Sequence, residues 1–373
     1  MGKEIRTRMC ILDVDYVIDD DKNTIRIWGK TEDGKTIVAI DNGFVPYFYV
    51  EPNEITEKLK KEIMELKVQE HKVKKLEVVE KKIYGEPRKL LKIYVDNFRL
   101  VPKFRNIIKE WKDVKEEYEY ALSFYKRYII DKDIIPMMWV EVTGESISYD
   151  VEADLVLEIK EIKKIELDRV PQLRTVAFDI EVVQKGEREE IIMVSLMGNG
   201  IKKVITHGKG KSKGMVTVVN DEKSLLEEFI KTIKELDPDI IVGYNTDRYD
   251  FIKIDQKCED YNVPLVLGRT KRQVVFKKRG RISSAYIEGR VHIDLYDFVE
   301  HILGPSLSTE ILTLDRVAKE LLVVGKDGKS WRDIEKSWKN GDLESVAEYC
   351  IKDSELTLKL SEHILPQIFE LSR

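Results

Sequence analysis

The sequence lacks the features that would mark a membrane, secreted or disordered protein. No window approaches the roughly 18 consecutive apolar residues of a transmembrane helix, and the N-terminal segment MGKEIRTRMC has no apolar core of a signal peptide. Only three cysteines occur, Cys10, Cys258 and Cys350, and their spacing matches no metal-binding motif. We therefore expect a soluble protein of a reducing cytoplasm.

Charge of one sign is also lacking. The 64 Lys and Arg residues nearly balance the 69 Asp and Glu residues, so the net charge is only −5. This small excess excludes an acidic disordered protein, and an acidic isoelectric point argues against a non-specific nucleic-acid coat, although local basic stripes can still bind phosphates. Glutamine and asparagine are sparse whereas Lys, Glu and Ile are abundant, a bias typical of proteins from hot environments.

The length of 373 residues is enough for two domains, and the order of the predicted elements favours an α/β fold class. Residues 1–140 predict an α+β N-terminal domain that includes a β-α-β-β-α-β segment, the split βαβ pattern. Residues 141–172 alternate apolar and charged residues and predict a β-rich connector. Residues 173–364 predict three antiparallel strands followed by strand–helix alternation, which suggests a ribonuclease H-like domain with a mixed sheet. We expect residues 365–373 to return towards the N-terminal domain.

Two acidic residues, Asp179 and Glu181, lie in the apolar segment TVAFDIEVV. In a strand both carboxylates project from the same face, a few ångströms apart, while Phe178 and Ile180 project from the other. Carboxylates placed so close together repel each other unless a cation lies between them. The pair therefore indicates a divalent-metal site, the alternative being two edge-strand charges that face water.

A third carboxylate, Asp353, is predicted on the apolar stripe of a C-terminal helix. Val346, Cys350 and Leu356 share this stripe at helical spacing, and it carries no Lys or Arg to neutralise the acid. Tyr349 lies one turn before Asp353, so that the phenol and the carboxylate point the same way. An ordinary core tyrosine is the alternative for Tyr349.

A fourth carboxylate, Asp250, follows the predicted strand DIIVGYN at a strand-to-helix transition. Asn245 and Asp247 lie close by in the sequence, and each of the three is a favourable helix N-cap. One cap cannot account for all three. At least one of these side chains is left for another role.

Two basic segments are candidates for phosphate contacts. The segment GKGKS at 208–212 lacks the first glycine of a P-loop, so Lys209, Lys211 and Lys213 are interpreted as a solvated loop. Residues 269–290 hold eight Lys or Arg residues and one acid, and predict a hairpin that turns near 278–280. This hairpin is either a solvated face or a ridge that contacts phosphates, with Phe276 and Tyr286 available for stacking on bases.

The ordered motifs D-x-E, Y-N-x(4)-D and Y-x(3)-D resemble the three exonuclease motifs of family B DNA polymerases, in the DEDD group of 3′–5′ exonucleases that uses a tyrosine. The segments ILDVDYVID, FVPYFYV, SFYKRYIIDKDIIPM and ILPQIFELSR extend the resemblance to the archaeal branch and to nearly the whole chain. The D-x-x-S-L-Y-P and Y-x-D-T-D motifs of the polymerase palm do not occur. The resemblance therefore implies the N-terminal and exonuclease part of such an enzyme, either cut from a longer chain or encoded by a split gene.

The resemblance implies two Mg²⁺ or Mn²⁺ ions. Asp179, Glu181 and Asp353 would hold the first, and Asp179 with Asp250 the second. Tyr349 would orient the attacking water and Asn245 the terminal nucleotide. Val182 and Tyr249 stand where the family usually has Thr and Phe, which affects no metal ligand. The expected substrate contacts are Asn245, Tyr249, Arg269, Lys271 and Arg272.

Archaeal members of the family also bind template uracil, and the matching positions here are Tyr16, Pro46, Tyr47, Val101 and Arg127. The segment NFRLVP departs from the family pattern H-P-x-D-V-P, with Phe98 in place of its proline. The resemblance implies single-stranded and primer–template DNA as partners, and a second chain with palm, fingers and thumb as a further one. The competing hypotheses are a nucleic-acid-binding scaffold whose exonuclease is slow or silent, and a free-standing exonuclease that trims RNA.

Overall fold

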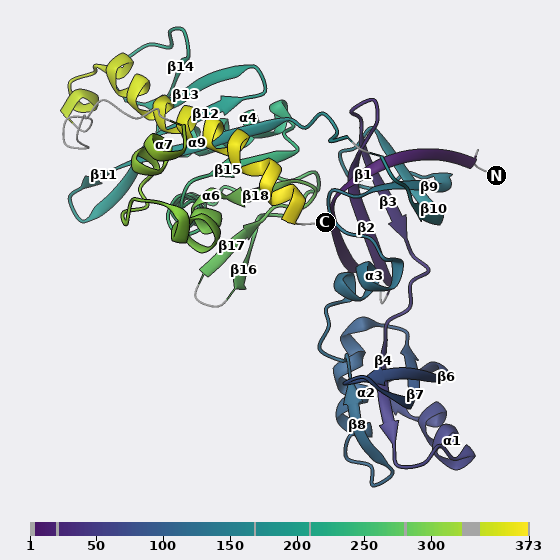
Figure 1. The fold of residues 1–373 in the computed structure, drawn as a ribbon. Coiled ribbons are helices and arrows are strands. Elements are labelled where there is room, and N and C mark those ends of the chain that lie inside the picture. Colours follow the sequence, from purple (N-terminus) through teal and green to yellow (C-terminus); the bar gives the residue numbers. More distant parts are fainter. Residues whose placement is uncertain are drawn as a thin grey trace. The chain divides into compact units, whose positions relative to one another are not determined.

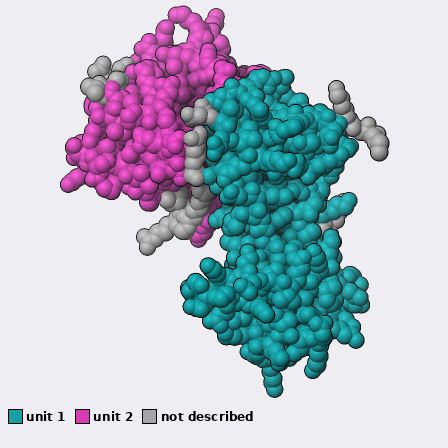
Figure 2. All heavy atoms as spheres, turned by 45° about the vertical axis from the view of Figure 1, so that its right-hand side comes forward, with its two compact units in different colours: residues 1–149, 153–170 teal, residues 150–152, 171–373 magenta. Residues whose placement is uncertain are grey.

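The computed structural model describes residues 4–19, 22–167, 169–208, 210–279, 282–322 and 336–371. The chain divides into two compact units (Figure 2). Unit 1 comprises residues 1–149 and 153–170, and unit 2 comprises residues 150–152 and 171–373. No helix of the described residues is long and apolar enough to cross a membrane.

A closed five-stranded barrel forms one half of unit 1. Its strands follow the order β1-β2-β3-β10-β9. Their bounds are Glu4–Asp19 for β1, Lys22–Thr31 for β2, Thr36–Asp41 for β3, Trp139–Ser146 for β9 and Leu155–Lys164 for β10. Helix α3 (Phe124–Lys132) packs Phe124 and Tyr128 into the barrel core. The strands predicted as a separate connector are therefore part of this barrel, because Val140, Val142 and Leu157 join the same core.

The other half of unit 1 is a five-stranded sheet of order β5-β6-β7-β4-β8. Its strands are β4 (Tyr47–Pro52), β5 (Lys67–Val68), β6 (His71–Ile83), β7 (Glu86–Val95) and β8 (Val114–Tyr118). Helices α1 (Glu57–Glu65) and α2 (Val101–Ile108) pack against one face, and the short helix η1 (Phe98–Leu100) precedes α2. The segment β4-α1-β6-β7-α2-β8 confirms the predicted split βαβ pattern.

Unit 2 is built on a six-stranded mixed sheet of order β14-β13-β12-β11-β15-β18 (Figure 1). The bounds are Thr175–Lys185 for β11, Arg188–Gly198 for β12, Ile201–His207 for β13, Val216–Val219 for β14, Ile240–Gly243 for β15 and Val291–Asp294 for β18. Strands β11 to β13 pair in an antiparallel manner, whereas β15 and β18 extend the sheet in parallel. This arrangement confirms the predicted ribonuclease H-like core, to which β14 adds an edge strand.

Among the described residues of unit 2, the remaining elements are helices and one hairpin. The helices are α4 (Glu222–Leu236), α5 (Asp250–Asp260), α6 (Leu295–Phe298), η2 (Val299–Leu303), η3 (Gly304–Ser306), α7 (Leu314–Leu322) and α9 (Leu343–Leu371). The hairpin consists of β16 (Val275–Arg279) and β17 (Ile282–Tyr286), which confirms the hairpin predicted from the basic segment. Its predicted turn residue Gly280 lies outside the described residues.

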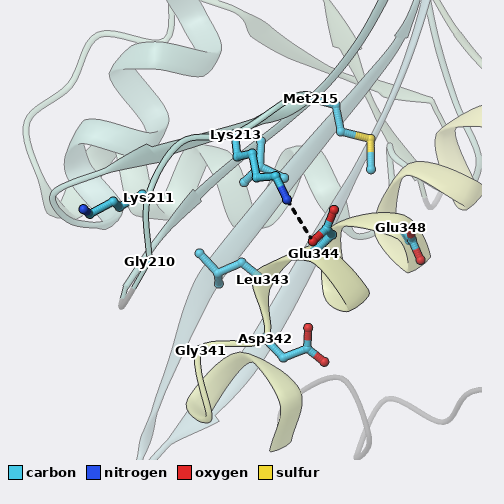
Figure 3. Close-up of a pocket in the computed structure, with 11 residues that line it drawn as sticks. Gly210, Lys211, Lys213, Met215, Gly341, Asp342, Leu343, Glu344 and Glu348 are labelled. Carbon is cyan, nitrogen blue, oxygen red and sulfur yellow. Dashed lines mark ion pairs between the residues drawn. The ribbon is translucent and has the colours of Figure 1, made fainter.

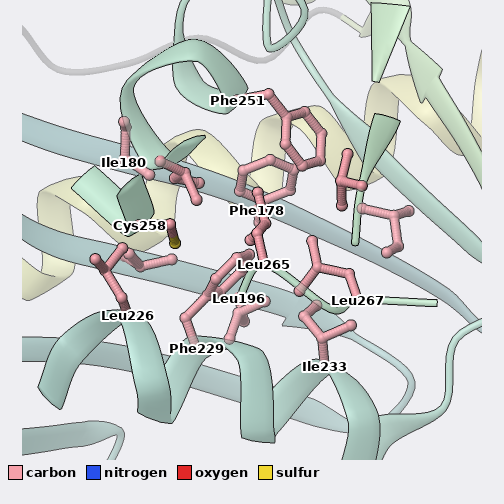
Figure 4. Packing of buried hydrophobic residues seen from close by; sticks show 14 of the residues in the cluster. Phe178, Ile180, Leu196, Leu226, Phe229, Ile233, Phe251, Cys258, Leu265 and Leu267 are labelled. Atoms are coloured by element: carbon pink, nitrogen blue, oxygen red, sulfur yellow. The ribbon is translucent and has the colours of Figure 1, made fainter. Parts of the chain in front are cut away.

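The two faces of β11 meet different helices. Phe178 and Ile180 enter an apolar core with Phe229 of α4 and Phe251 of α5 (Figure 4). On the other face of the sheet lies α9, whose Leu365 packs with Ala177 of β11. The alternation predicted for TVAFDIEVV therefore decides which side chains of β11 face α9. Residues 365–371 are the last turns of α9, and their predicted return towards the N-terminal domain stays a prediction.

Candidate active site

The D-x-E pair lies on a central strand. Strand β11 pairs with β12 on one side and β15 on the other, so its carboxylates are not edge-strand charges. Asp179 and Glu181 are half-buried, and each offers an oxygen to a cluster with the Cys350 sulfur of α9. The three donor atoms lie within 4.8 Å of one another. The pair therefore faces α9, at the place where the sequence predicts a metal site.

Serine side chains hold α9 against the sheet beside Asp179. Asp179 is the register partner of Ser195 in β12. The Ser195 hydroxyl donates to the backbone carbonyl of Cys350 at 3.0 Å and lies 2.6 Å from the hydroxyl of Ser354. Ser195, Cys350 and Ser354 are all fully buried. These contacts therefore fix the position of α9 against the sheet within the close-packed core.

Asp353 lies on the buried stripe of α9, as predicted. Its side chain is 8% exposed, and Val346, Cys350 and Leu356 of the same stripe are buried. The charges of Glu181, Asp179 and Asp353 all add to burial in raising the pKa of the Cys350 thiol. The charge of Asp353 thus acts on the same thiol as the charges of the D-x-E pair. Tyr349 is half-buried and packs against the apolar cluster of β12, β13 and α9.

Asp250 joins the site from the other helix. It is the first residue of α5, is only 5% exposed, and accepts a hydrogen bond of 3.2 Å from the backbone N–H of Ile180. That N–H belongs to the residue between Asp179 and Glu181. Four carboxylates thus converge from β11, α5 and α9.

None of the three candidate caps serves α5 as an N-cap. The cap position is Tyr249, whose side chain makes no capping hydrogen bond. Asn245 has a left-handed backbone (φ +67°), and Asp247 accepts a hydrogen bond of 2.7 Å from the backbone N–H of Ala285 in β17. Asp247 therefore ties the loop after β15 to the basic hairpin.

Asp294 organises this loop and was not singled out from the sequence. Its Oδ1 accepts hydrogen bonds from the backbone N–H groups of Asn245 (2.7 Å) and Tyr296 (3.0 Å), and its Oδ2 accepts one from Asp247 (3.0 Å). The carboxyl ends of parallel strands meet at one edge of a sheet, and β15 and β18 both end here. An acid at the end of the apolar segment VHID was the signal that could have identified it.

The sequence model of the family described as "DNA polymerase family B, exonuclease domain" matches residues 115–308. This chain belongs to DNA polymerase family B. Curated relatives include the DNA polymerase of Thermococcus kodakarensis, 31% identical over 371 residues (97% of this chain, 20% of the relative), and that of Thermococcus gorgonarius, 32% identical over 371 residues (97% and 43%). The chain thus spans less than half the length of these relatives.

A solved structure agrees with this assignment. The family B DNA polymerase from the hyperthermophilic archaeon Pyrobaculum calidifontis is similar with a TM-score of 0.84 and 26% sequence identity. The match covers 98% of this chain and 46% of that one. The archaeal resemblance inferred from the motifs is confirmed.

The four carboxylates of this family B chain fit hard divalent cations. Carboxylate oxygens are the ligands that Mg²⁺ and Mn²⁺ prefer. Burial, with the nearby charges of Asp294 and Asp353, raises the pKa of Asp250 to about 7, although the Ile180 N–H acts in the opposite direction. A group of acids held together at this cost is typical of a site completed by positive charge.

The raised pKa of Asp250 makes the stability of the metal-free protein depend on pH. An acid whose pKa is higher in the folded than in the unfolded chain stabilises the fold at low pH, and this contribution is lost as pH rises through about 4 to 7. Each unit of difference corresponds to about 1.4 kcal/mol. In chelator, Asp250→Asn should therefore unfold at a higher denaturant concentration than the unmodified protein at pH 8, and at nearly the same concentration at pH 4. Parallel curves for the two proteins across this range would contradict the assignment.

Arg269 is a buried residue that stabilises the fold. This corrects the expectation that it contacts the substrate. It is 1% exposed and its guanidinium bonds to Asp237 (3.0 Å), Asp239 (2.8 Å) and the carbonyl of Gly289 (2.7 Å). A guanidinium that is buried and held by these partners is not accessible to a phosphate. Lys271 and Arg272 are exposed, and both stay candidates for DNA contacts.

The two aromatic residues of the hairpin are both partly covered by neighbouring side chains. Phe276 is half-buried and packs against the core of unit 2, and its stacking on a base stays a prediction. Tyr286 is half-buried beneath Lys277, whose Nζ lies 3.0 Å from the ring centroid. Lys277 therefore occupies one face of the Tyr286 ring.

The GKGKS loop borders a cavity of about 320 Å³ at the start of α9 (Figure 3). Lys213 lies 3.6 Å from Glu344 across this cavity, whose lining also includes Asp342 and Glu348. Three acids facing two lysines do not form an anion site, in line with the rejected P-loop. Lys209 lies outside the described residues.

The positions that match the uracil site are grouped around Phe98 and Tyr47 in unit 1. Phe98, which replaces the proline of the family pattern, makes edge contacts with the ring of Tyr16 at 5.8 Å and packs against Phe124 at 5.5 Å. Pro46 and Val101 are buried. Tyr47 accepts a hydrogen bond of 3.2 Å from Arg127 and donates one to Asp131.

Proposed function

We propose that this chain is a divalent-metal-dependent exonuclease that removes nucleotides from the 3′ end of single-stranded DNA. The observation that carries the proposal is the convergence of Asp179, Glu181, Asp250 and Asp353 from three elements of the exonuclease domain. Membership of family B supports a nuclease that acts on DNA.

Asp179, Glu181 and Asp353 would hold one divalent ion, and Asp179 with Asp250 a second. When bound, a pair of such ions supplies a hydroxide nucleophile near neutral pH and stabilises the departing 3′ oxygen. Tyr349, one turn from Asp353 on α9, orients the attacking water with its phenol.

The other residues of the site position the terminal nucleotide. The side chain of Tyr249 is 40% exposed beside the carboxylates, where its ring can stack on a base. The backbone N–H of Asn245 donates to Asp294, which fixes this residue at the same edge of the sheet. Lys271 and Arg272 contact phosphates of the strand further from its 3′ end.

The test is degradation of single-stranded DNA that carries a label at its 5′ end. With Mg²⁺ or Mn²⁺ the label should move in steps to shorter products, and chelator should stop the reaction. A nucleic-acid-binding scaffold would bind the strand without shortening it, and an RNA-trimming enzyme would prefer the RNA strand of the same sequence. A palm-bearing second chain, if required, should restore cleavage when it is added.

We also propose that unit 1 binds uracil in single-stranded DNA at Tyr16, Pro46, Tyr47, Val101 and Arg127. A snug pocket would exclude the methyl group of thymine, and one well-read group is worth about 1–3 kcal/mol. In titrations with chelator, a uracil strand should bind about tenfold more tightly than the matching thymine strand. Val101→Gln should remove this preference by filling the pocket. Equal affinities in the unmodified protein would contradict the proposal.

A further inference from the structure

A cysteine sulfur lies beside the carboxylates of the proposed metal site. Cys350 is fully buried on α9, and its Sγ lies within 4.8 Å of a carboxylate oxygen of Asp179 and one of Glu181. The two-ion mechanism uses oxygen ligands only, so it assigns no role to this thiol.

The three donors are held by two rigid elements. Asp179 and Glu181 lie on the central strand β11, and the Cys350 backbone is fixed by the hydroxyl of Ser195. Tetrahedral zinc sites have Zn–S distances near 2.3 Å and Zn–O distances of about 2.0–2.2 Å, so their donor atoms lie about 3.5 Å apart. The donor atoms of this chain lie within 4.8 Å of one another, so binding requires them to approach by about 1.3 Å at most.

We propose that Cys350 is a metal ligand, and that Asp179, Glu181 and Cys350 bind a thiophilic divalent cation such as Zn²⁺ or Cd²⁺. This inference rests on the proposed function only in that both use the carboxylates of Asp179 and Glu181. The cation takes the sulfur as thiolate, and the thiol proton passes to solvent. Three protein ligands leave the fourth tetrahedral position for water or an oxygen of DNA. Mg²⁺ prefers oxygen and leaves the sulfur unbound.

This mode of binding competes with the one that supports cleavage, because both need Asp179 and Glu181. A cation bound at Cys350 would not be placed to bind Asp353 and the water that Tyr349 is proposed to orient. We therefore expect Zn²⁺ or Cd²⁺ to inhibit the Mg²⁺-dependent exonuclease.

The other thiols offer matched controls. Cys258 of α5 is buried in the apolar core of unit 2, where burial raises the pKa of its thiol to about 12. Cys10 is buried in unit 1. In a second group of potential ligands, Asp297, Glu300 and His301, the Arg248 guanidinium already neutralises the acids, with contacts to Asp297 at 2.9 Å and to Glu300 at 2.6 Å.

The experiment titrates the full chain, stripped of metal and free of DNA, with Cd²⁺ and records the ultraviolet thiolate-to-cadmium charge-transfer absorbance. The unmodified protein and Cys258→Ser should both show a band that saturates at one equivalent. Cys350→Ser should lack the band and bind Cd²⁺ at least about tenfold more weakly, since loss of an outer-shell partner alone costs 10- to 100-fold. Asp179→Ala retains the thiol, so the band should still appear, but it should saturate only at a higher Cd²⁺ concentration.

Two outcomes would overturn the inference: no band in the unmodified protein, or an undiminished band in Cys350→Ser. Cys350→Ala gives a second variant in case serine disturbs the packing of α9, and its melting temperature in chelator verifies the fold. Because the titration contains no DNA, it separates the two proposals. Cleavage without a band would contradict the cysteine ligand alone, and a band without cleavage would contradict the exonuclease alone.

Discussion

Asp179→Ala should lower the rate of 3′-end cleavage by a factor on the order of a thousand or more. Asp179 is the one carboxylate proposed to contact both ions, so its loss weakens the positioning of the nucleophile and of the leaving oxygen together. The charge stabilisation supplied by a bound metal is worth several kcal/mol, and each 1.4 kcal/mol is about a factor of ten in rate. The measurement is single-turnover cleavage of labelled single-stranded DNA at saturating Mg²⁺.

The fold should survive this substitution. Removing one of several crowded carboxylates relieves repulsion, so the melting temperature in chelator should stay the same or rise. Asp260→Ala is the matched control, because Asp260 is an exposed carboxylate at the end of α5 and lies outside the site. Its rate should be unchanged. Undiminished cleavage by Asp179→Ala would refute the assignment of the metal site.

Tyr349→Phe should reduce the rate by about 10- to 1000-fold, in the range for one positioned catalytic group, with little change in melting temperature. The phenylalanine ring keeps the packing against the apolar cluster of β12 and β13, and only the hydroxyl that orients water is lost. The effect should fall on kcat at saturating DNA, because the tyrosine acts on the attacking water and not on the bound strand.

The control for Tyr349 is a tyrosine of the same unit with a structural hydroxyl. Tyr244 donates a hydrogen bond of 2.6 Å to the carbonyl of Leu312, so Tyr244→Phe should lose stability and keep its turnover per folded molecule. If Tyr349→Phe behaves as Tyr244→Phe does, then Tyr349 is a core residue and another group orients the water.

The amino-acid sequence by itself determined the elements and the chemistry that they carry. Alternation in TVAFDIEVV placed Asp179 and Glu181 on one face of a strand, and helical spacing placed Asp353 and Tyr349 on one stripe of a helix. Both patterns are local, since side-chain direction in a strand or a helix follows from backbone geometry alone. The order of strands and helices was equally local, which is why the split βαβ segment and the ribonuclease H-like core were predicted.

Only the tertiary structure decided which of these side chains meet, because contacts between distant segments depend on packing that no local pattern encodes. It placed Cys350 beside the acids of β11. It also showed that Asp294 holds the loop that carries Asn245 through hydrogen bonds to backbone N–H groups. It also closed β9 and β10 into a barrel, since their inward residues fill the same core as those of β1 to β3. Arg269 shows the same limit most plainly: eight basic residues in one segment predicted a charged surface, but three-dimensional packing buried this one among Asp237 and Asp239.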